Sequence, residues 1–168
     1  EVAVVPGEAA TNNSEAENTV DAHTLNIRKL SKAFSANDIL CSPLYTEPIS
    51  TEEQQVVFVK KVCKLANNAD VLVLDWQMEA GAFSDKKGTT AQTIIEKYKA
   101  ENPDRDILIC IFTAEEADKV QAEQLSGDNV KVFYVFKKDG YDKLPDRIFC
   151  EFAKRHEGLL PSAALSAL

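Results

Sequence analysis

The sequence of 168 residues is short of positive charge and of long apolar runs. Its 19 lysines and arginines face 27 aspartates and glutamates, which gives a formal net charge of −8. Such an excess of negative charge repels phosphate backbones and anionic lipid, so we expect no nucleic acid and no membrane as partners of this domain. No apolar stretch approaches the roughly 18 residues of a membrane-spanning helix. The chain opens with no signal-peptide pattern, and we expect a cytoplasmic protein.

Cysteine and histidine are too few and too scattered to predict a metal site. The four cysteines lie in apolar stretches without a Cys-x-x-Cys pair, at Cys41, Cys63, Cys110 and Cys150. We predict buried, reduced thiols rather than disulfides or a zinc site. The two histidines, His23 and His156, stand alone and are expected at the surface.

Glycine-rich nucleotide-binding motifs are also missing. The sequence contains neither Gly-x-Gly-x-x-Gly nor a P-loop pattern, so it offers no phosphate-binding loop. No serine or cysteine lies in a nucleophile elbow, which argues against a hydrolase. Residues 7–11 form only a poor phosphate loop, so an unrelated flavodoxin-like enzyme or cofactor binder is a weak alternative.

The sequence does contain apolar runs that alternate with amphipathic stretches. The apolar runs predict strands near residues 2–5, 39–45, 71–74, 107–112 and 130–136. Apolar spacings of three and four predict helices near residues 24–35, 50–67, 89–101, 115–125 and 145–157. A capping box of Ser50 and Glu53 opens the second helix. This alternation predicts an α/β fold, with parallel strands and helices on both faces of the sheet.

The chain length predicts one domain, over residues 1–158. Residues 7–21 are polar and lack an apolar period, so we expect a flexible surface loop. Residues 159–168 are predicted to begin one more helix.

Polar side chains follow the predicted strands where ligands bind in open parallel sheets, at the carboxyl ends. Asp75 ends the third strand, Thr113 ends the fourth, and Lys137 follows the fifth. An acid, a hydroxyl and an amine are therefore expected to converge on one edge of the sheet.

Residues 71–75, 109–114 and 134–137 resemble the receiver domain of two-component response regulators. Residues 33–41, 73–78 and 158–161 are similar to the divergent bacterial "response receiver" group. The resemblance covers nearly the whole chain. It implies a flavodoxin-like (βα)5 fold, a doubly wound five-stranded parallel sheet with strand order 2-1-3-4-5.

The resemblance also implies a role for each side chain at the sheet edge. Asp75 would be the phosphoacceptor, Thr113 would donate its hydroxyl to a phosphoryl oxygen, and Lys137 would pair with another. Tyr134 occupies the place of the aromatic switch residue. A magnesium ion would be held by Asp75 and the backbone carbonyl of Gln77.

The implied function is that of a signal receiver in a phosphorelay, not of an enzyme. The expected phosphodonor is a histidine kinase or a phosphotransfer protein. Residues 159–168 would begin a linker helix toward a C-terminal effector domain. The face made by the fourth helix, fifth strand and fifth helix would read out the added charge and is expected to support a homodimer.

One departure from the receiver pattern puts the magnesium ion in question. Receivers end their first strand with two adjacent acids, but here Pro6 and Gly7 stand in those places. Glu8 is a weak candidate ligand one residue later, and Glu79 is another. Three explanations stay open: a degenerate receiver that takes no phosphate, compensation by one of these glutamates, or a different position for the first strand. The alternative function is a pseudo-receiver, an interaction module that works without phosphorylation.

Each candidate also has an ordinary structural explanation. Asp75 could simply end its strand, and Thr113 begins a Thr-x-x-Glu capping box. Lys138 competes with Lys137 for the same role, and Tyr134 could be a core residue.

Overall fold

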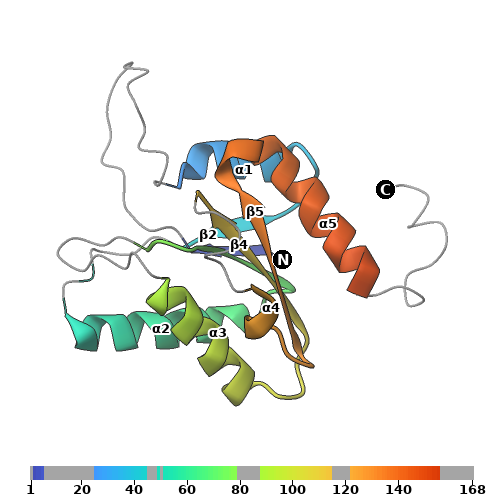
Figure 1. The fold of residues 1–168 in the computed structure, drawn as a ribbon. Helices are drawn as coiled ribbons and strands as arrows, with labels where there is room; N and C mark the ends of the chain where they lie inside the picture. Colours follow the sequence, from blue (N-terminus) through green and yellow to red (C-terminus); the bar gives the residue numbers. More distant parts are fainter. Residues whose placement is uncertain are drawn as a thin grey trace.

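The computed structural model describes residues 2–5, 25–44, 49, 51–78, 88–114 and 122–155. In this part of the chain, strands and helices alternate (Figure 1). The strands are β1 (Val2–Val5), β2 (Cys41–Pro43), β3 (Val71–Asp75), β4 (Ile107–Thr113) and β5 (Val130–Phe136). The helices are α1 (Ile27–Ser35), α2 (Glu52–Ala66), α3 (Thr89–Glu101), α4 (Ala122–Leu125) and α5 (Leu144–Arg155). Two 3-10 turns, η2 (Lys137–Asp139) and η3 (Tyr141–Lys143), connect β5 to α5.

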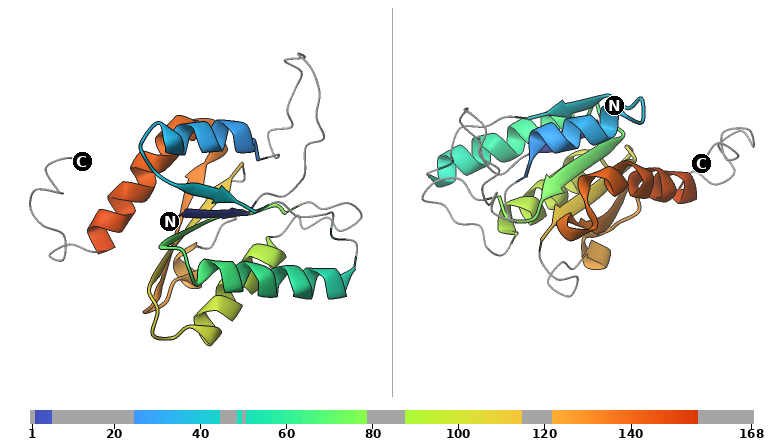
Figure 2. Two further views of the ribbon diagram at one scale, coloured as in Figure 1. Left: turned by 180° about the vertical axis from the view of Figure 1, so that it is seen from behind. Right: turned by 90° about the horizontal axis from the view of Figure 1, so that it is seen from above.

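The strands form one sheet in the order β2-β1-β3-β4-β5, and every neighbouring pair is parallel. The predicted order is therefore confirmed. Helices α1 and α5 cover one face of the sheet, while α2, α3 and α4 lie on the other (Figure 1). The view from behind in Figure 2 shows the same two helical layers. This is the doubly wound α/β arrangement that strand–helix alternation favours.

Every residue of the central strands β3 and β4 is buried, which explains why their sequences are apolar without alternation. Successive side chains still point to opposite faces. Leu72 and Leu74 pack in the cluster under α2 and α3, whereas Val71 and Val73 pack under α1 and α5. The predicted buried stripe of α3 is confirmed, because Ala91, Ile94, Ile95 and Tyr98 are all fully buried.

Helix α1 begins at Ile27, three residues later than predicted. The Asn26 side chain accepts a hydrogen bond from the Lys29 backbone N–H at 2.9 Å and so caps the helix.

Helix α2 is capped one residue after the predicted capping box. Thr51 Oγ1 accepts from the Gln54 N–H at 3.2 Å, and Gln54 Oε1 accepts from the Thr51 N–H at 3.3 Å. Threonine and glutamine three residues apart satisfy the same rule as the predicted Ser50 and Glu53. The sequence therefore held two overlapping capping boxes, and the structure uses the second.

Strand β2 begins at Cys41 rather than at residue 39. Ile39 belongs to the turn after α1, because its N–H donates to the Phe34 carbonyl at 3.1 Å. Asp38 reaches this turn with a φ of 56°. Leu40 then stays 68% exposed, so two residues of the apolar run lie before the strand.

Several predicted segments lie wholly or partly outside the described residues. Of the helix expected at 115–125, only α4 is described. The loop at 7–21, the segment at 159–168 and both histidines are outside this part of the chain. No described helix is long and apolar enough to cross a membrane.

The prediction that all four cysteines are buried is wrong for Cys150, which is exposed. Cys150 lies two residues after the buried Ile148 on α5, so it points away from the sheet. Cys63 and Cys110 are buried and Cys41 is half-buried, and all four thiols are free. Burial raises the pKa of the Cys63 thiol to about 11.

Candidate functional site

The sheet register brings the ends of three neighbouring strands to one edge. Asp75, the last residue of β3, lies beside Phe112 of β4. Thr113, the last residue of β4, lies beside Phe136 of β5, and Lys137 follows directly. The three candidate residues at the ends of β3, β4 and β5 therefore share the carboxyl edge of the sheet, as the sequence predicted.

Asp75 and Lys137 form a buried ion pair. Lys137 Nζ donates to Asp75 Oδ2 at 2.6 Å, and the two side chains are only 7% and 2% exposed. Asp75 Oδ1 accepts a further hydrogen bond from the Gln77 backbone N–H at 3.3 Å. Both carboxylate oxygens are thus engaged. Because burying a charge is costly unless it is paired, the lysine offsets part of the cost of burying this carboxylate.

The competition between the two adjacent lysines is decided by geometry. Lys137 reaches Asp75, whereas Lys138 Nζ lies 4.8 Å from the centroid of the Phe136 ring. That distance is in the range of a cation–π contact. Consecutive lysines therefore point to different surroundings.

Thr113 and Tyr134 hold the two remaining predicted positions. Thr113 is buried, with 1% of its surface exposed, at the end of β4. Tyr134 is half-buried on β5 and packs against the cluster under α2 and α3. Its ring centroid lies 5.2 Å from that of Phe136. The ring of Tyr134 thus packs against the core from a partly exposed position three residues before Lys137.

Sequence reasoning missed Tyr141, which borders the site from η3. Its hydroxyl accepts a hydrogen bond from the Asn26 backbone N–H at 2.7 Å, and its ring meets Phe112 edge-on at a centroid distance of 5.0 Å. Burial raises the pKa of the Tyr141 hydroxyl, and the negative charge of Asp75 also raises it. Tyr141 therefore joins the turn after Lys137 to the start of α1. In the sequence, only its position four residues after Lys137 could have indicated that Tyr141 lies near the site.

Sequence reasoning also missed the contact between Trp76 and Gly88. Trp76 follows Asp75 and is only 3% exposed. Gly88 caps α3 with a φ of +69°, and a Cβ placed there would lie 2.2 Å from the Trp76 ring. Both the backbone conformation and the close approach require glycine at this position. The start of α3 is thereby packed against the residue next to Asp75.

The position of the first strand is as predicted. Val5, the last residue of β1, pairs with Leu74, one residue before Asp75. In sequence, Pro6 and Gly7 come next, and neither has a side-chain oxygen. A misplaced first strand therefore no longer explains the missing acids.

The residues of the described part of the chain do not fit a magnesium site. They contain no group of three or more histidine, cysteine, aspartate or glutamate side chains that could hold a metal ion. Asp75 is the one predicted side-chain ligand among them, and its Oδ2 is paired with Lys137. Magnesium needs oxygen ligands in near-octahedral geometry and usually more than one anionic partner, such as a second carboxylate or a phosphate. The candidates Glu8 and Glu79 lie outside the described residues.

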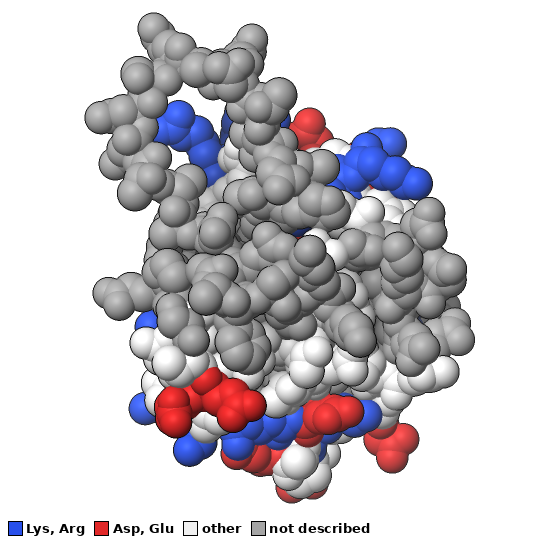
Figure 3. Space-filling view, turned by 60° about the vertical axis from the view of Figure 1, so that its left-hand side comes forward, with Lys and Arg blue, Asp and Glu red and all other residues white. Residues whose placement is uncertain are grey.

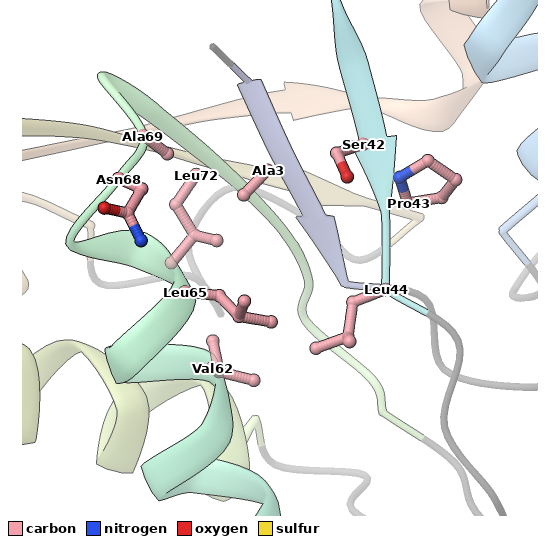
Figure 4. A pocket seen from close by; sticks show the side chains of 9 residues that line it. All are labelled: Ala3, Ser42, Pro43, Leu44, Val62, Leu65, Asn68, Ala69 and Leu72. Atoms are coloured by element: carbon pink, nitrogen blue, oxygen red, sulfur yellow. The ribbon is translucent and has the colours of Figure 1, made fainter.

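A separate cavity of about 310 Å³ lies between α2 and the strands β1 and β2 (Figure 4). Its lining is mostly apolar and includes Leu44, Val62 and Leu65. Of the predicted site residues that the structure describes, none lines it, so it is distinct from the pair of Asp75 and Lys137.

Comparison with known families agrees with this geometry. A family model described as the response receiver domain matches residues 2–157. The chain belongs to this family. As a receiver domain it has a signal-receiver role in two-component signalling, which is regulatory and implies interaction with kinases or other phosphodonors. No curated protein and no solved structure matches the chain.

Proposed function

We propose that this receiver domain accepts a phosphoryl group on Asp75 and thereby controls an effector attached after residue 168. The donor would be a phosphorylated histidine of a kinase or phosphotransfer protein. The observation that carries the proposal is the buried pair of Asp75 and Lys137, with Nζ and Oδ2 2.6 Å apart. The pair lies at the carboxyl ends of the parallel strands, which is where ligands bind in such sheets. A buried ion pair adds little to the stability of the fold by itself, so stability alone is a weak reason for its presence.

The reaction would be an in-line phosphoryl transfer. A carboxylate oxygen of Asp75 forms the new bond to phosphorus while the bond from phosphorus to the donor nitrogen breaks. The donor histidine keeps the electron pair of that bond. Lys137 neutralises negative charge on the transferred group, and the Thr113 hydroxyl donates to one of its oxygens. The domain itself acts as a regulator rather than as an enzyme.

Phosphorylation would then change the contacts of the residues around Asp75. The added charge of about −1.5 to −2 draws Lys137 from the carboxylate to the phosphoryl oxygens. Movement of Thr113 toward the same group would free space for the half-buried ring of Tyr134. The face of α4, β5 and α5 would carry this change to the effector or to a homodimer partner.

The metal dependence of this reaction is part of the proposal. Because the described residues supply too few carboxylates, we expect weaker magnesium binding than a receiver with two acids after β1 would show. Glu8 and Glu79 are the residues to replace if magnesium is required. Isothermal titration of Mg²⁺ into the protein and into the Glu8→Gln and Glu79→Gln variants measures this directly.

The phosphoacceptor is tested by incubation with acetyl phosphate and magnesium. We expect a mass gain of one phosphoryl group, which disappears in Asp75→Asn and persists in the matched variant Asp146→Asn on the exposed surface of α5. Wild-type protein without any mass gain, or Asp75→Asn with the full gain, would contradict the proposal.

The second candidate function is a pseudo-receiver that binds its partner without phosphorylation. The observation in its favour is that Pro6 and Gly7, which have no side-chain oxygen, follow β1 where receivers carry two acids. It predicts no specific magnesium binding and unchanged signalling in cells that carry Asp75→Asn. A signalling defect in those cells excludes it.

Location and remaining partners belong to the same proposal. A phosphorelay receiver works in the cytoplasm, where its kinase presents the phosphohistidine. The net charge of −8 makes nucleic acid or an anionic membrane an unfavourable partner for this domain.

A further inference from the structure

Helix α2 exposes two adjacent apolar residues in its first half. Val56 is 52% exposed and Val57 is 65% exposed, although the opposite side of the helix is buried against the sheet. Adjacent exposed valines on a regular helix make no contribution to the core, and they are poor helix formers. They form the centre of an outward-facing apolar patch.

Charged residues of opposite sign flank this patch along the helix axis. Glu53 lies before the valines and Lys60 and Lys64 lie after them, and all three are exposed. These residues and the valines follow spacings of three and four, so they share one stripe of the helix. We call this stripe, made of Glu53, Val56, Val57, Lys60 and Lys64, the α2 face. Along the lower edge of Figure 3, in the layer of α2 and α3, acidic and basic side chains lie close together.

We propose that the α2 face binds the α2 face of a second copy of this chain, with the two helices antiparallel. A twofold axis between Val56 and Val57 places these valines against the same valines of the second copy. The same axis brings Glu53 of one copy opposite Lys60 of the other, and the reverse pair forms by symmetry. Such a surface is self-complementary, as a twofold interface requires.

Charge order along the helix favours a second copy over other partners. A purely acidic partner would oppose Glu53, and a purely basic partner would oppose Lys60 and Lys64. An antiparallel copy pairs Glu53 with Lys60 in both directions and also covers the valines, while Lys64 lies beyond the paired positions. The charge arrangement therefore selects both the partner and its direction.

The size of the face sets the expected strength of the dimer. Helix α2 has 15 residues and is roughly 22 Å long. We expect a contact between two helices of this length to bury less surface than the roughly 1,200 Å² at the lower limit of stable interfaces. The dimer should therefore be weak and appear only as the protein concentration rises, in contrast to an obligate dimer.

Complementary charge reversal provides the test. Glu53→Lys makes the face wholly basic, and the double variant Lys60→Glu with Lys64→Glu makes it wholly acidic. Sedimentation velocity across a concentration series should show self-association of the wild type and at least about tenfold weaker self-association of each variant, because like charges then face each other. An equimolar mixture of the two variants should associate again, since each reversed charge meets its opposite.

The controls separate the α2 face from general effects of charge. Glu96→Lys makes the same charge change on the exposed surface of α3 and should self-associate like the wild type. Circular dichroism checks that each variant remains folded. A wild type that stays monomeric, variants that still self-associate, or a mixture that stays monomeric would each overturn the proposal. Variants that dimerise like the wild type would point instead to the face of α4, β5 and α5.

Discussion

The two ends of the sheet are each joined by an ion pair between distant segments, but the two pairs have different surroundings. At the carboxyl end, Lys137 and Asp75 are 7% and 2% exposed. At the amino-terminal end, Arg155 Nη2 donates to Asp106 Oδ1 at 2.9 Å, with side-chain exposures of 16% and 62%. Arg155 also donates to the Asp128 carbonyl at 3.3 Å.

This difference distinguishes the ion pair of the candidate site from an ion pair that only links two segments. An exposed pair is screened by water and contributes little, so its loss is tolerated. A buried pair makes only a small net contribution to the free energy of unfolding, yet removal of one partner alone is costly because a buried charge loses its counter-charge. The carboxyl end therefore contains a buried ion pair that apolar side chains of similar size could replace without loss of stability. Such costly buried charges are typical of functional positions.

The largest effect should come from removing the lysine at the carboxyl end. Lys137→Met leaves Asp75 buried without its cation and should lower the free energy of unfolding by about 3 to 5 kcal/mol. Lys138→Met is the matched control and should cost about 1 kcal/mol or less, since it loses only the contact with the Phe136 ring. Urea denaturation measures both. Equal losses in the two variants would remove the distinction between the two lysines.

The second effect concerns the contact beside Asp75. Gly88→Ala should lower the free energy of unfolding by about 2 to 3 kcal/mol, because a φ of +69° and the Trp76 ring both oppose a Cβ. Gly140→Ala has a similar positive φ of +90° but no atom within 4 Å of the new Cβ. It should therefore cost less and leave the Trp76 emission unchanged. Equal emission spectra for the two variants would argue against the packing at Gly88.

The third effect separates the hydroxyl of Tyr141 from its ring. Tyr141→Phe keeps the edge-on contact with Phe112 but loses the acceptor for the Asn26 N–H, at a cost of about 1 kcal/mol.

The pH dependence of stability provides an independent check on Tyr141. Its pKa is raised above the ordinary value of 10.0, so the folded state holds this proton more tightly than the unfolded state. The resulting stability is present below about pH 10 and is lost as the pH rises through the folded pKa. Urea denaturation at a series of pH values should therefore show that the free energy of unfolding falls more steeply with rising pH in the wild type than in Tyr141→Phe. Parallel curves would show that Tyr141 is not responsible.

The smallest effect is expected at the opposite end of the sheet. Arg155→Ala should change the free energy of unfolding by less than about 1 kcal/mol, because its partner Asp106 is largely exposed. Added salt should reduce even this difference. A loss as large as that of Lys137→Met would erase the contrast between the two ends.

The sequence predicted the fold well where apolar runs were continuous. Residues 71–75 and 107–113 are buried throughout, so their composition alone identified the central strands. The sequence predicted the first residue of an element less well where local hydrogen bonds decide which of several adjacent residues begins it. The start of β2 is set by the Asp38 turn, and the start of α2 by a choice between two overlapping capping boxes.

The same contrast applies to the candidate site. Asp75, Thr113 and Lys137 could be predicted, because the carboxyl ends of parallel strands meet at one edge. Tyr141 and Gly88 could not, since their roles depend on which distant side chain they meet in three dimensions. The exposure of Cys150 was missed because α5 covers the sheet with only one of its sides.

The proline that ends β2 has a consequence for the behaviour of the protein at high concentration. β2 is the border strand of the sheet, and Pro43 has no N–H with which to pair an incoming strand. With only three residues, this border is also a short template for cross-β stacking. A short border strand that contains a proline is a poor template for the strand-by-strand growth that leads to fibrils.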